Sequence, residues 1–552
     1  MNIAALSLKM LEPRRRAFEA STADPLKTQE KVLFEYLKRN RNTEYGRKYN
    51  FPKIRSIKDY QASVPLVDYE KIRPYIDRMA SGEANVLTGD RVIFFGATSG
   101  TTAKPKLIPT TKYSEAQKQH LLNLWSSYIV KDHPEIGAGK ILAIVSPQDE
   151  GRTPSGLLFG AESGHSYRAL PGPILRLYSL PYQVFDIQDY EARHYVILRI
   201  SMAQNITNIA TLNPNTITLL CQKIERWQDL IIDDIEHGTL SSRIDIPGAI
   251  RKSIAKHLKP DPKRADELRS ILKDKGKLLP KDFWPHLALV ECWKGGMMRL
   301  YLKELDAYLG NIPKRDMGYT STEALSSIPV SDENADGILA IQTNFYEFIP
   351  KAEIRKKARR ILLCNELEKG GEYFIVVTTA GGLYRYNIDD IIKVTGFFNK
   401  TPMIEFVQKG LGATSLAGEK LYESHVNEAM SRALEKNRLV IEFSCAVARP
   451  DEGPRYVFLV EFSGDAPSDL QKKKLLLSIE EELCHENREY DFVRKAQLLK
   501  SPVLKVLGKG SFENYRSKKI GNGGQEGQFK APQLTDETDF EKNFSIEEVV
   551  SL

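Results

Sequence analysis

The chain has 552 residues, 79 basic and 72 acidic side chains, and a formal net charge of +7 at pH 7. This length exceeds one small core and predicts two domains, one of them large. The charge excess is small and dispersed, which disfavours a nucleic-acid-binding protein, although its sign favours the approach of anionic substrates.

The five cysteines are far apart, and none belongs to a C-x-x-C pair. This pattern disfavours a disulfide framework or a zinc site and favours a reducing compartment. The N-terminal arginines follow a short apolar stretch instead of preceding a long one, and no segment is apolar over a membrane-spanning length. We therefore expect a cytoplasmic protein without membrane contact.

Hydrophobic periodicity predicts alternating helices and strands over the first 400 or so residues. Apolar residues at helical spacing predict helices at 25–40, 112–130, 189–210 and 215–236. Short apolar runs predict strands at 91–95, 140–145, 287–292, 337–343 and 372–379. This mixture predicts an α/β fold class for the large domain.

The composition changes near residue 410, where KGLGATSLAGEKL holds three glycines and no long apolar run. A separate α+β module follows, with predicted helices and strands at 422–437, 439–448, 455–463 and 468–488. We therefore place the domain boundary at residue 421, between a large N-terminal domain (1–421) and a small C-terminal domain (422–552). The glycine-rich segment 508–530 is predicted to be a mobile loop.

Residues 96–106, GATSGTTAKPK, follow a predicted strand and precede a predicted helix. Small residues let the backbone approach a ligand, and backbone N–H groups and hydroxyls donate to phosphate oxygens. The order of strand, loop and helix is typical of phosphate sites, although the spacing is not that of a Walker A loop. The alternative is a flexible surface turn. The candidate phosphate ligands are Thr98, Ser99, Gly100, Thr101 and Thr102, with Lys104 and Lys106 adding positive charge.

Residues 318–323 read GYTSTE. Glu323 follows several hydroxyl residues, and Mg²⁺ prefers oxygen ligands that it shares with phosphates. Tyr319 is a candidate to pack on a purine. The alternative is a helix N-cap made by the serine or threonine of this segment.

Residues 382–390 read GLYRYNIDD. A carboxylate such as Asp390 accepts hydrogen bonds from both hydroxyls of a ribose. The alternative is a charged hairpin turn between strands at 372–379 and 391–397.

The three motifs in this order resemble those of the adenylate-forming superfamily. The wider sequence resembles the Gretchen Hagen family of acyl acid amido synthetases, and a bacterial-type member of it. The blocks that carry the resemblance are NTEYGRKYNF (42–51), VPLVDYEKIRPYIDRM (64–79), TSGTTAKPKLIP (98–109), GYTSTEALSSIP (318–329), NFYEFIP (344–350), LYRYNIDDIIKVTGF (383–397), LAGEKLYESHV (416–426) and NGGQEGQFKAPQL (522–534).

The resemblance implies ATP and Mg²⁺ as cofactors and a small C-terminal domain that moves between two half-reactions. It places the phosphate-loop hydroxyls on Thr98, Ser99, Thr101 and Thr102, the nucleotide contacts on Tyr319, Thr322 and Asp390, and the metal ligand on Glu323. It places the hinge lysine on Lys420 and the lysine that meets the α-phosphate on Lys530.

Two residues depart from the family pattern. Asp389 stands where glycine usually precedes the ribose aspartate, and Lys409 stands where arginine often follows the F-V strand. Lysine does not form the bidentate fork of arginine. We expect both departures to change the affinity for the nucleotide more than the class of reaction.

The resemblance implies a ligase that adenylates a carboxylic acid and transfers the acyl group to an amine, most simply an amino acid. Two alternatives remain at this point. One is a synthetase of the same type with coenzyme A or another thiol as acceptor, and the other is a nucleotide-binding or acyl-binding protein without catalysis. The sequence identifies neither the acid nor the acceptor, and a monomer is compatible with it.

Overall fold

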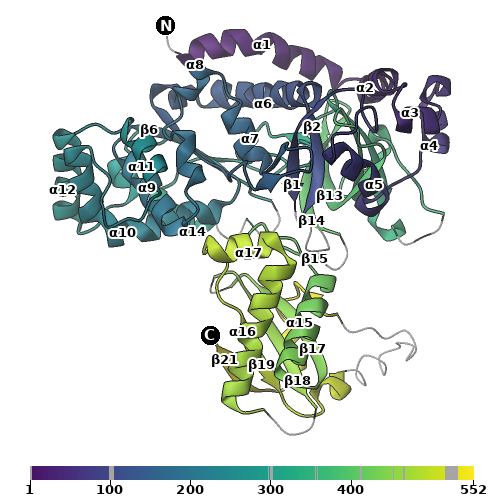
Figure 1. Cartoon of the computed structure of the whole chain (residues 1–552). Helices are drawn as coiled ribbons and strands as arrows, with labels where there is room; N and C mark the ends of the chain where they lie inside the picture. The colour runs from purple at the N-terminus through teal and green to yellow at the C-terminus, as the bar shows by residue number, and fades with distance from the viewer. Residues whose placement is uncertain are drawn as a thin grey trace. The chain divides into compact units, whose positions relative to one another are not determined.

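The structure, a computed structural model, describes residues 3–98, 105–295, 298, 302–354, 356, 358–410, 413–451, 453–463, 467–515 and 532–552. The chain divides into two compact units, residues 1–98 with 107–407 and residues 99–106 with 408–552. Helices and strands are mixed in both units (Figure 1), which confirms the α/β fold class. The functional boundary at residue 421 and the movement of the small domain stay predictions.

A parallel sheet with the order β3-β6-β7-β8 lies in the first unit. Its strands are β3 (Lys140–Ile144), β6 (Ile206–Thr211), β7 (Leu289–Glu291) and β8 (Lys314–Arg315). They share an apolar core with α9 (Tyr190–Met202) and α10 (Pro214–His237). Asn213 caps α10, Pro214 opens it, and Gly238 ends it with a φ of 70°, as expected from residues of these types.

The predicted helix at 189–210 is wrong in its last part. The helix ends at Met202, and residues 206–211 form β6, which is central in the parallel sheet. Ile206, Thr207 and Ile209 are β-branched and fully buried. A continuous apolar run of this kind suits a strand buried on both faces, and periodicity alone does not separate it from the preceding helix.

An antiparallel sheet with the order β11-β12-β13-β14-β10-β9 carries the second part of the first unit. Its strands are β9 (Ser327–Ile328), β10 (Gly337–Leu339), β11 (Asn344–Pro350), β12 (Glu372–Thr379), β13 (Tyr386–Phe398) and β14 (Thr401–Lys409). Buried Gln29 of α2 (Pro25–Arg39) donates to the carbonyls of Ile341 and Asn344 at 2.7 and 2.6 Å and accepts from Tyr346 N–H. This amide fixes the N-terminal helices to the sheet.

A smaller sheet with the order β2-β1-β5-β4 contains the strand that leads into the predicted phosphate loop. Its strands are β1 (Val92–Thr98), β2 (Lys106–Thr111), β4 (Gly151–Arg152) and β5 (Leu158–Gly160). Two helices follow its strands, α6 (Lys112–Asp132) after β2 and α7 (Glu162–Arg168) after β5 (Figure 1). A capping box between Thr111 and Ser114 starts α6.

The remaining helices of the first unit cover these sheets. They are α1 (Ile3–Ser21), α3 (Glu44–Lys48), α4 (Ile57–Ser63), α5 (Tyr69–Ala80), α8 (Gly172–Leu175), α11 (Gly248–Ala255), α12 (Pro262–Lys275), α13 (Pro280–Phe283) and α14 (Leu302–Leu309). Within the described ranges, no helix combines the length and the apolar character needed to cross a membrane.

The second unit is built on a five-stranded sheet with the order β20-β17-β18-β19-β21. The strands are β17 (Ile441–Arg449), β18 (Arg455–Phe462), β19 (Val503–Leu507), β20 (Leu534–Thr535) and β21 (Ile546–Ser551). The helices are α15 (Glu423–Asn437), α16 (Asp469–Glu486) and α17 (Arg488–Lys495), and a short ladder joins β15 (Ala413–Thr414) to β16 (Leu421–Tyr422). The predicted helices and strands after residue 421 are thus confirmed within a few residues.

Candidate active site

Strands β1 and β5 bring two chain segments to one edge of their sheet. The strands are parallel, with Gly96 opposite Gly160, so the residues after β1 and the first residues of α7 leave the sheet at the same edge. A Cβ atom on Gly96 would lie 2.5 Å from Thr322 Cγ2 and 3.1 Å from Glu162 Oε2. Glycine is therefore required, and Thr322 of the second motif packs directly against β1.

The predicted phosphate loop is only partly described. Thr98 ends β1, whereas Ser99, Gly100, Thr101 and Thr102 lie outside the described residues. Lys530 also lies outside them, and the roles of these residues stay predictions. The predicted order of strand, loop and helix needs one correction, because β2 stands between the loop and α6. The run from Lys106 to Thr111 pairs with β1, and helix formation begins only at the capping box.

The second and third motifs meet through Tyr319 and Asp390. Tyr319 Oη donates a hydrogen bond of 2.7 Å to Asp390 Oδ2, and both side chains are buried. The ring of Tyr319 stacks on Phe406 at 5.8 Å between centroids and 16° between planes. Burial, and then the Asp390 carboxylate, raise the pKa of Tyr319 well above its usual value, so Tyr319 remains a donor. One face of the ring predicted to pack on a purine is thus in contact with Phe406.

Asp316 holds the turn that presents Tyr319. Its carboxylate accepts hydrogen bonds from Lys294 N–H at 2.7 Å and from Gly318 N–H at 2.6 Å. Gly318 has a φ of 78°, and a Cβ there would lie 2.5 Å from the Ser327 carbonyl oxygen. Burial raises the pKa of Asp316 to about 7. Asp316 was not predicted as a site residue, because an acidic residue two positions before a glycine is common in ordinary turns.

Asp390 lies in a bulge of β13. Phe374 pairs with Ile391 and Val376 pairs with Asn387, so residues 388–390 face only one residue of β12. Asp389 has a φ of 65°, in the left-handed region, and its N–H donates to Asn387 Oδ1 at 3.1 Å. This backbone angle explains why glycine suits the position, and aspartate is among the residues that tolerate it. The hairpin interpretation of this segment is confirmed, with Asp390 inside the strand.

Arg385, the arginine of the third motif, has a structural role. It is buried, and its guanidinium donates to both carboxylate oxygens of Glu347 at 2.9 Å. It also donates to the carbonyls of Gln61 and Val64, each at 2.7 Å. Four hydrogen bonds from one guanidinium thus join the turn before β13 to β11 and to the α4 segment. No local sequence pattern links these distant residues.

Glu323 and Thr322 lie in the turn between β8 and β9. The Ser321 hydroxyl accepts from Ala324 N–H at 3.2 Å, which is the capping bond that the alternative predicted. The capped segment is a turn that leads into β9 and not into a helix. Glu323 is 8% exposed and forms no ion pair with any residue that the structure describes. A buried carboxylate without a cation partner suits a metal ligand, because an isolated buried charge is costly.

The two lysines assigned to nucleotide and hinge functions belong to the second unit. Lys409 ends β14 and is buried. Lys420 N–H donates to Glu489 Oε2 at 2.9 Å, and its Nζ lies 3.8 Å from Glu489 Oε1. The preceding Glu419 is fully buried and accepts from Leu416 N–H, Ala417 N–H and Tyr456 Oη. Lys420 therefore stands on a segment fixed by a buried acid.

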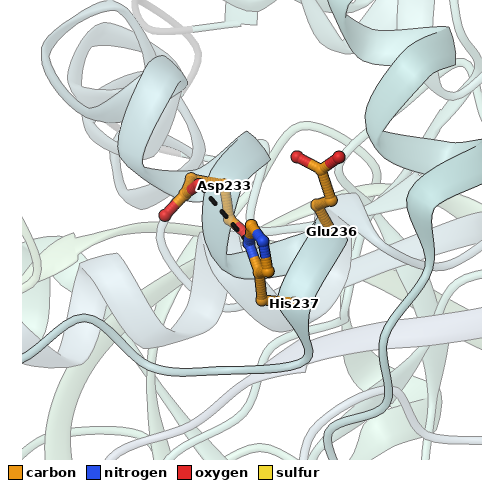
Figure 2. A group of neighbouring side chains, drawn as sticks. All are labelled: Asp233, Glu236 and His237. Carbon is orange, nitrogen blue, oxygen red and sulfur yellow. Dashed lines mark hydrogen bonds and ion pairs between the residues drawn. The ribbon is translucent and has the colours of Figure 1, made fainter.

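The last turn of α10 carries another group of possible metal ligands, Asp233, Glu236 and His237 (Figure 2). Asp233 and His237 are exposed, and Glu236 pairs with Arg269 of α12. The His237 ring lies 2.9 Å from the Asp233 carbonyl oxygen, as expected for a side chain at a helix C-terminus. These contacts account for the group without a metal.

Comparison with known proteins shows three family matches along the chain. Residues 14–314 match the GH3 family N-terminal domain, residues 337–409 the GH3 family central domain, and residues 424–539 the GH3 family C-terminal domain. The matches span most of the sequence and include the first and third motifs.

Curated proteins and solved structures give the same result. The chain is 28% identical to the indole-3-acetic acid-amido synthetase GH3.3 of Arabidopsis thaliana, over 94% of this chain and 90% of that protein. It is 27% identical to the jasmonoyl–L-amino acid synthetase JAR6 of Nicotiana attenuata, over 97% and 94%. Its fold matches the GH3.15 acyl acid amido synthetase with a TM-score of 0.66, at 23% identity and covering 100% and 98% of the two chains. The family resemblance found in the sequence is thus confirmed, whereas the bacterial-type assignment stays a prediction. The chain belongs to the GH3 family.

Proposed function

We propose that this protein is an AMP-forming acyl acid amido synthetase, which joins a small carboxylic acid to an amino acid at the expense of ATP. The observation that carries the proposal is that the second motif contacts both β1 and the third motif within the first unit. Thr322 packs on β1, which leads into the phosphate loop, and Tyr319 binds Asp390. The curated relatives named above are synthetases for indole-3-acetic acid and jasmonate amides, and a GH3.15 structure holds 2,4-DB.

The nucleotide would be held by residues of all three motifs. The hydroxyls of Thr98, Ser99, Thr101 and Thr102, with Gly100, would bind phosphate oxygens. Asp390 would accept hydrogen bonds from the ribose hydroxyls, and Thr322, which packs against β1, would lie beside the phosphates. Lys409, Lys420 and Lys530 would add positive charge.

Glu323 would hold Mg²⁺, since its carboxylate is buried beside the other motif residues and pairs with none of the described cations. When bound, Mg²⁺ supplies neutralisation of charge on the phosphate oxygens. The chain's own residues would orient the nucleotide and exclude water. Positioning of the reactants then supplies most of the catalysis.

The first half-reaction forms an oxygen–phosphorus bond. A carboxylate oxygen of the acid attacks the α-phosphorus, the bond to the pyrophosphate oxygen breaks with its electron pair, and acyl-AMP and pyrophosphate result. In the second half-reaction, the amine nitrogen of an amino acid attacks the acyl carbon after losing a proton. The carbon–oxygen bond breaks toward AMP, and the amide nitrogen releases a second proton to solvent.

A moving C-terminal domain is part of the proposal, with residues 422–552 moving against residues 1–421. Lys530 lies on a glycine-rich segment, which suits a group that is used in one half-reaction. The cytoplasm is the proposed location. All five cysteines are free, and burial raises the pKa of Cys292 and Cys364 to about 12, as expected for inert structural thiols.

The test of this function is pyrophosphate release from ATP and Mg²⁺ across aryl, indole, jasmonate-like and fatty acids. Release that depends on one acid class, and an amide that forms only when an amino acid is added, are the expected results. A thioester with coenzyme A and no amide would support the thiol-acceptor alternative. ATP binding without pyrophosphate release for any acid would support a non-catalytic binding protein.

A further inference from the structure

An ion pair and a histidine–carboxylate contact join helices α6 and α7, which lie side by side near the end of β1 (Figure 1). Lys118 Nζ of α6 lies 2.6 Å from Glu162 Oε1 of α7. One turn along each helix, Glu115 Oε1 lies 3.1 Å from His165 Nε2. The His165 ring also stacks on Phe94, with centroids 4.1 Å apart and planes 2° apart. The two pairs have the same helix spacing, and the carboxylate stands on α7 in the first pair and on α6 in the second.

The pair of Lys118 and Glu162 lies beside the second motif and the end of β1. Glu162 Oε2 lies 3.1 Å from the Cβ position of Gly96, where Thr322 also packs, and it accepts from the buried Thr110 hydroxyl at 3.4 Å. The side chains of Lys118 and Glu162 are 16% and 15% exposed. Partial burial makes such a pair costly in desolvation.

We propose that Lys118 and Glu162 form the subsite for the acceptor amino acid. This subsite rests on the proposed function. At neutral pH an α-amino acid carries an ammonium and a carboxylate on the same carbon. Glu162 receives the ammonium, and Lys118 receives the carboxylate. Each protein charge keeps an opposite partner when the amino acid enters between them, so opening the pair leaves no buried charge uncompensated.

The polarity of the pair also sets the direction of the acceptor. Glu162, not Lys118, is the member that lies against Gly96 and therefore beside Thr322. An ammonium on Glu162 thus places the nitrogen on the side of the nucleotide motifs, where it must attack. The carboxylate on Lys118 then points toward α6. This arrangement selects α-amino acids over plain amines and over thiols.

The test measures amide formation with a saturating acid and ATP and a varied amino acid. Glu162→Gln and Lys118→Met each raise the KM for the amino acid by roughly ten- to hundredfold, as expected for a lost charge-assisted hydrogen bond. The KM for the carboxylic acid stays unchanged in both variants. The wild-type protein prefers an amino acid to its carboxamide, and Lys118→Met reduces that preference, which a merely structural role does not explain.

The neighbouring pair is the matched control. Glu115→Gln breaks the same kind of contact between the same helices, and it leaves the KM for the amino acid unchanged. The exchange of both charges, Lys118→Glu with Glu162→Lys, restores an ion pair but reverses its direction. The subsite predicts that the exchange does not restore amide formation, whereas a role in helix docking predicts that it does.

The outcomes separate the two proposals. Amide formation by the wild-type protein together with an unchanged amino-acid KM in both single variants overturns the subsite and leaves the proposed function intact. Rescue by the charge exchange, or an effect on the KM for the acid alone, also overturns the subsite. Failure of the wild-type protein to form an amide with any amino acid overturns both proposals.

Discussion

Tyr319 and Asp390, 71 residues apart in sequence, are joined by a buried hydrogen bond of 2.7 Å between the phenol and a carboxylate oxygen. Asp316 fixes the turn that presents Tyr319, and the bulge of β13 presents Asp390. The nucleotide motifs are thus held to each other by side chains that the fold places before any substrate binds. Such preorganisation reduces the conformational entropy that the site loses when the nucleotide binds.

The first prediction concerns this hydrogen bond. Tyr319→Phe keeps the ring stacked on Phe406 and removes the donor to Asp390. We expect the KM for ATP to rise roughly tenfold, as for about 1.5 kcal/mol from a hydrogen bond to a charged group. Acid-dependent pyrophosphate release measures it. Tyr384→Phe is the control, since its buried hydroxyl donates to the Leu87 carbonyl at 3.0 Å, away from Asp390. Equal effects on the KM in the two variants would contradict the assigned role.

The second prediction concerns the left-handed backbone of Asp389. Asp389→Gly relieves the strain at a φ of 65° and removes a carboxylate next to Asp390. We expect an increase of up to about 1 kcal/mol in the free energy of unfolding, together with a lower KM for ATP. Asp389→Val should lose stability, because a β-branched residue is poorly tolerated there. Urea denaturation that ranks the valine variant at or above the other two would refute this account.

The third prediction concerns the buried ion pair of Arg385 and Glu347. Arg385→Met leaves the Glu347 carboxylate buried without its partner, so we expect a loss of about 3–5 kcal/mol in the free energy of unfolding. Adding Glu347→Leu should recover much of that loss, because no charge is then left unpaired. Chemical denaturation of both variants measures it. If the double variant were as unstable as the single one, the stabilisation by Arg385 would come from its other hydrogen bonds and not from the ion pair.

The fourth prediction concerns Glu323. Glu323→Ala removes the proposed metal ligand from a turn that is closed by Ser321 and Ala324. We expect loss of adenylation over a wide range of Mg²⁺ concentrations, with an unchanged circular dichroism spectrum. Glu333→Ala is the control, since that residue lies on an exposed loop of the same unit. Wild-type adenylation by Glu323→Ala at low Mg²⁺ would remove Glu323 from the metal site.

The fifth prediction concerns the lysines of the second unit. Lys530→Ala should lower the rate of acyl-AMP formation by two to three powers of ten, as for the loss of one group that stabilises transition-state charge. ATP binding, measured by calorimetry, should be mostly retained. Lys509→Ala, which changes a lysine at the start of the same segment, should keep the rate. A normal rate in Lys530→Ala would show that another cation meets the α-phosphate.

Sequence reasoning predicted those features that depend on neighbouring residues. The capped helix α10, the hairpin around Asp390 and the helices and strands after residue 421 follow from local periodicity and turn residues. Strand β6 was missed, because its apolar run continues the pattern of the helix before it. Its strand conformation depends on pairing with β3 and β7, which lie far away in the chain.

The same distinction applies to the candidate site. The three motifs were recognisable in order, but their meeting depends on contacts across hundreds of residues, such as Gly96 with Thr322. The support by Asp316, the structural role of Arg385 and the pair of Lys118 and Glu162 have no local signature. Charged residues at helical spacing are common on solvent-facing helices, so only the fold distinguishes Lys118 from its neighbours.

In the proposed reaction, the acid passes through an acyl-adenylate before it meets the amine. An acid labelled with ¹⁸O in its carboxylate tests this order, with mass spectrometry of the products formed with ATP and the amino acid. We expect one heavy oxygen in AMP and one in the amide, because the attacking oxygen stays on phosphorus when the carbon–oxygen bond breaks. Unlabelled AMP, or ADP with labelled phosphate, would contradict it.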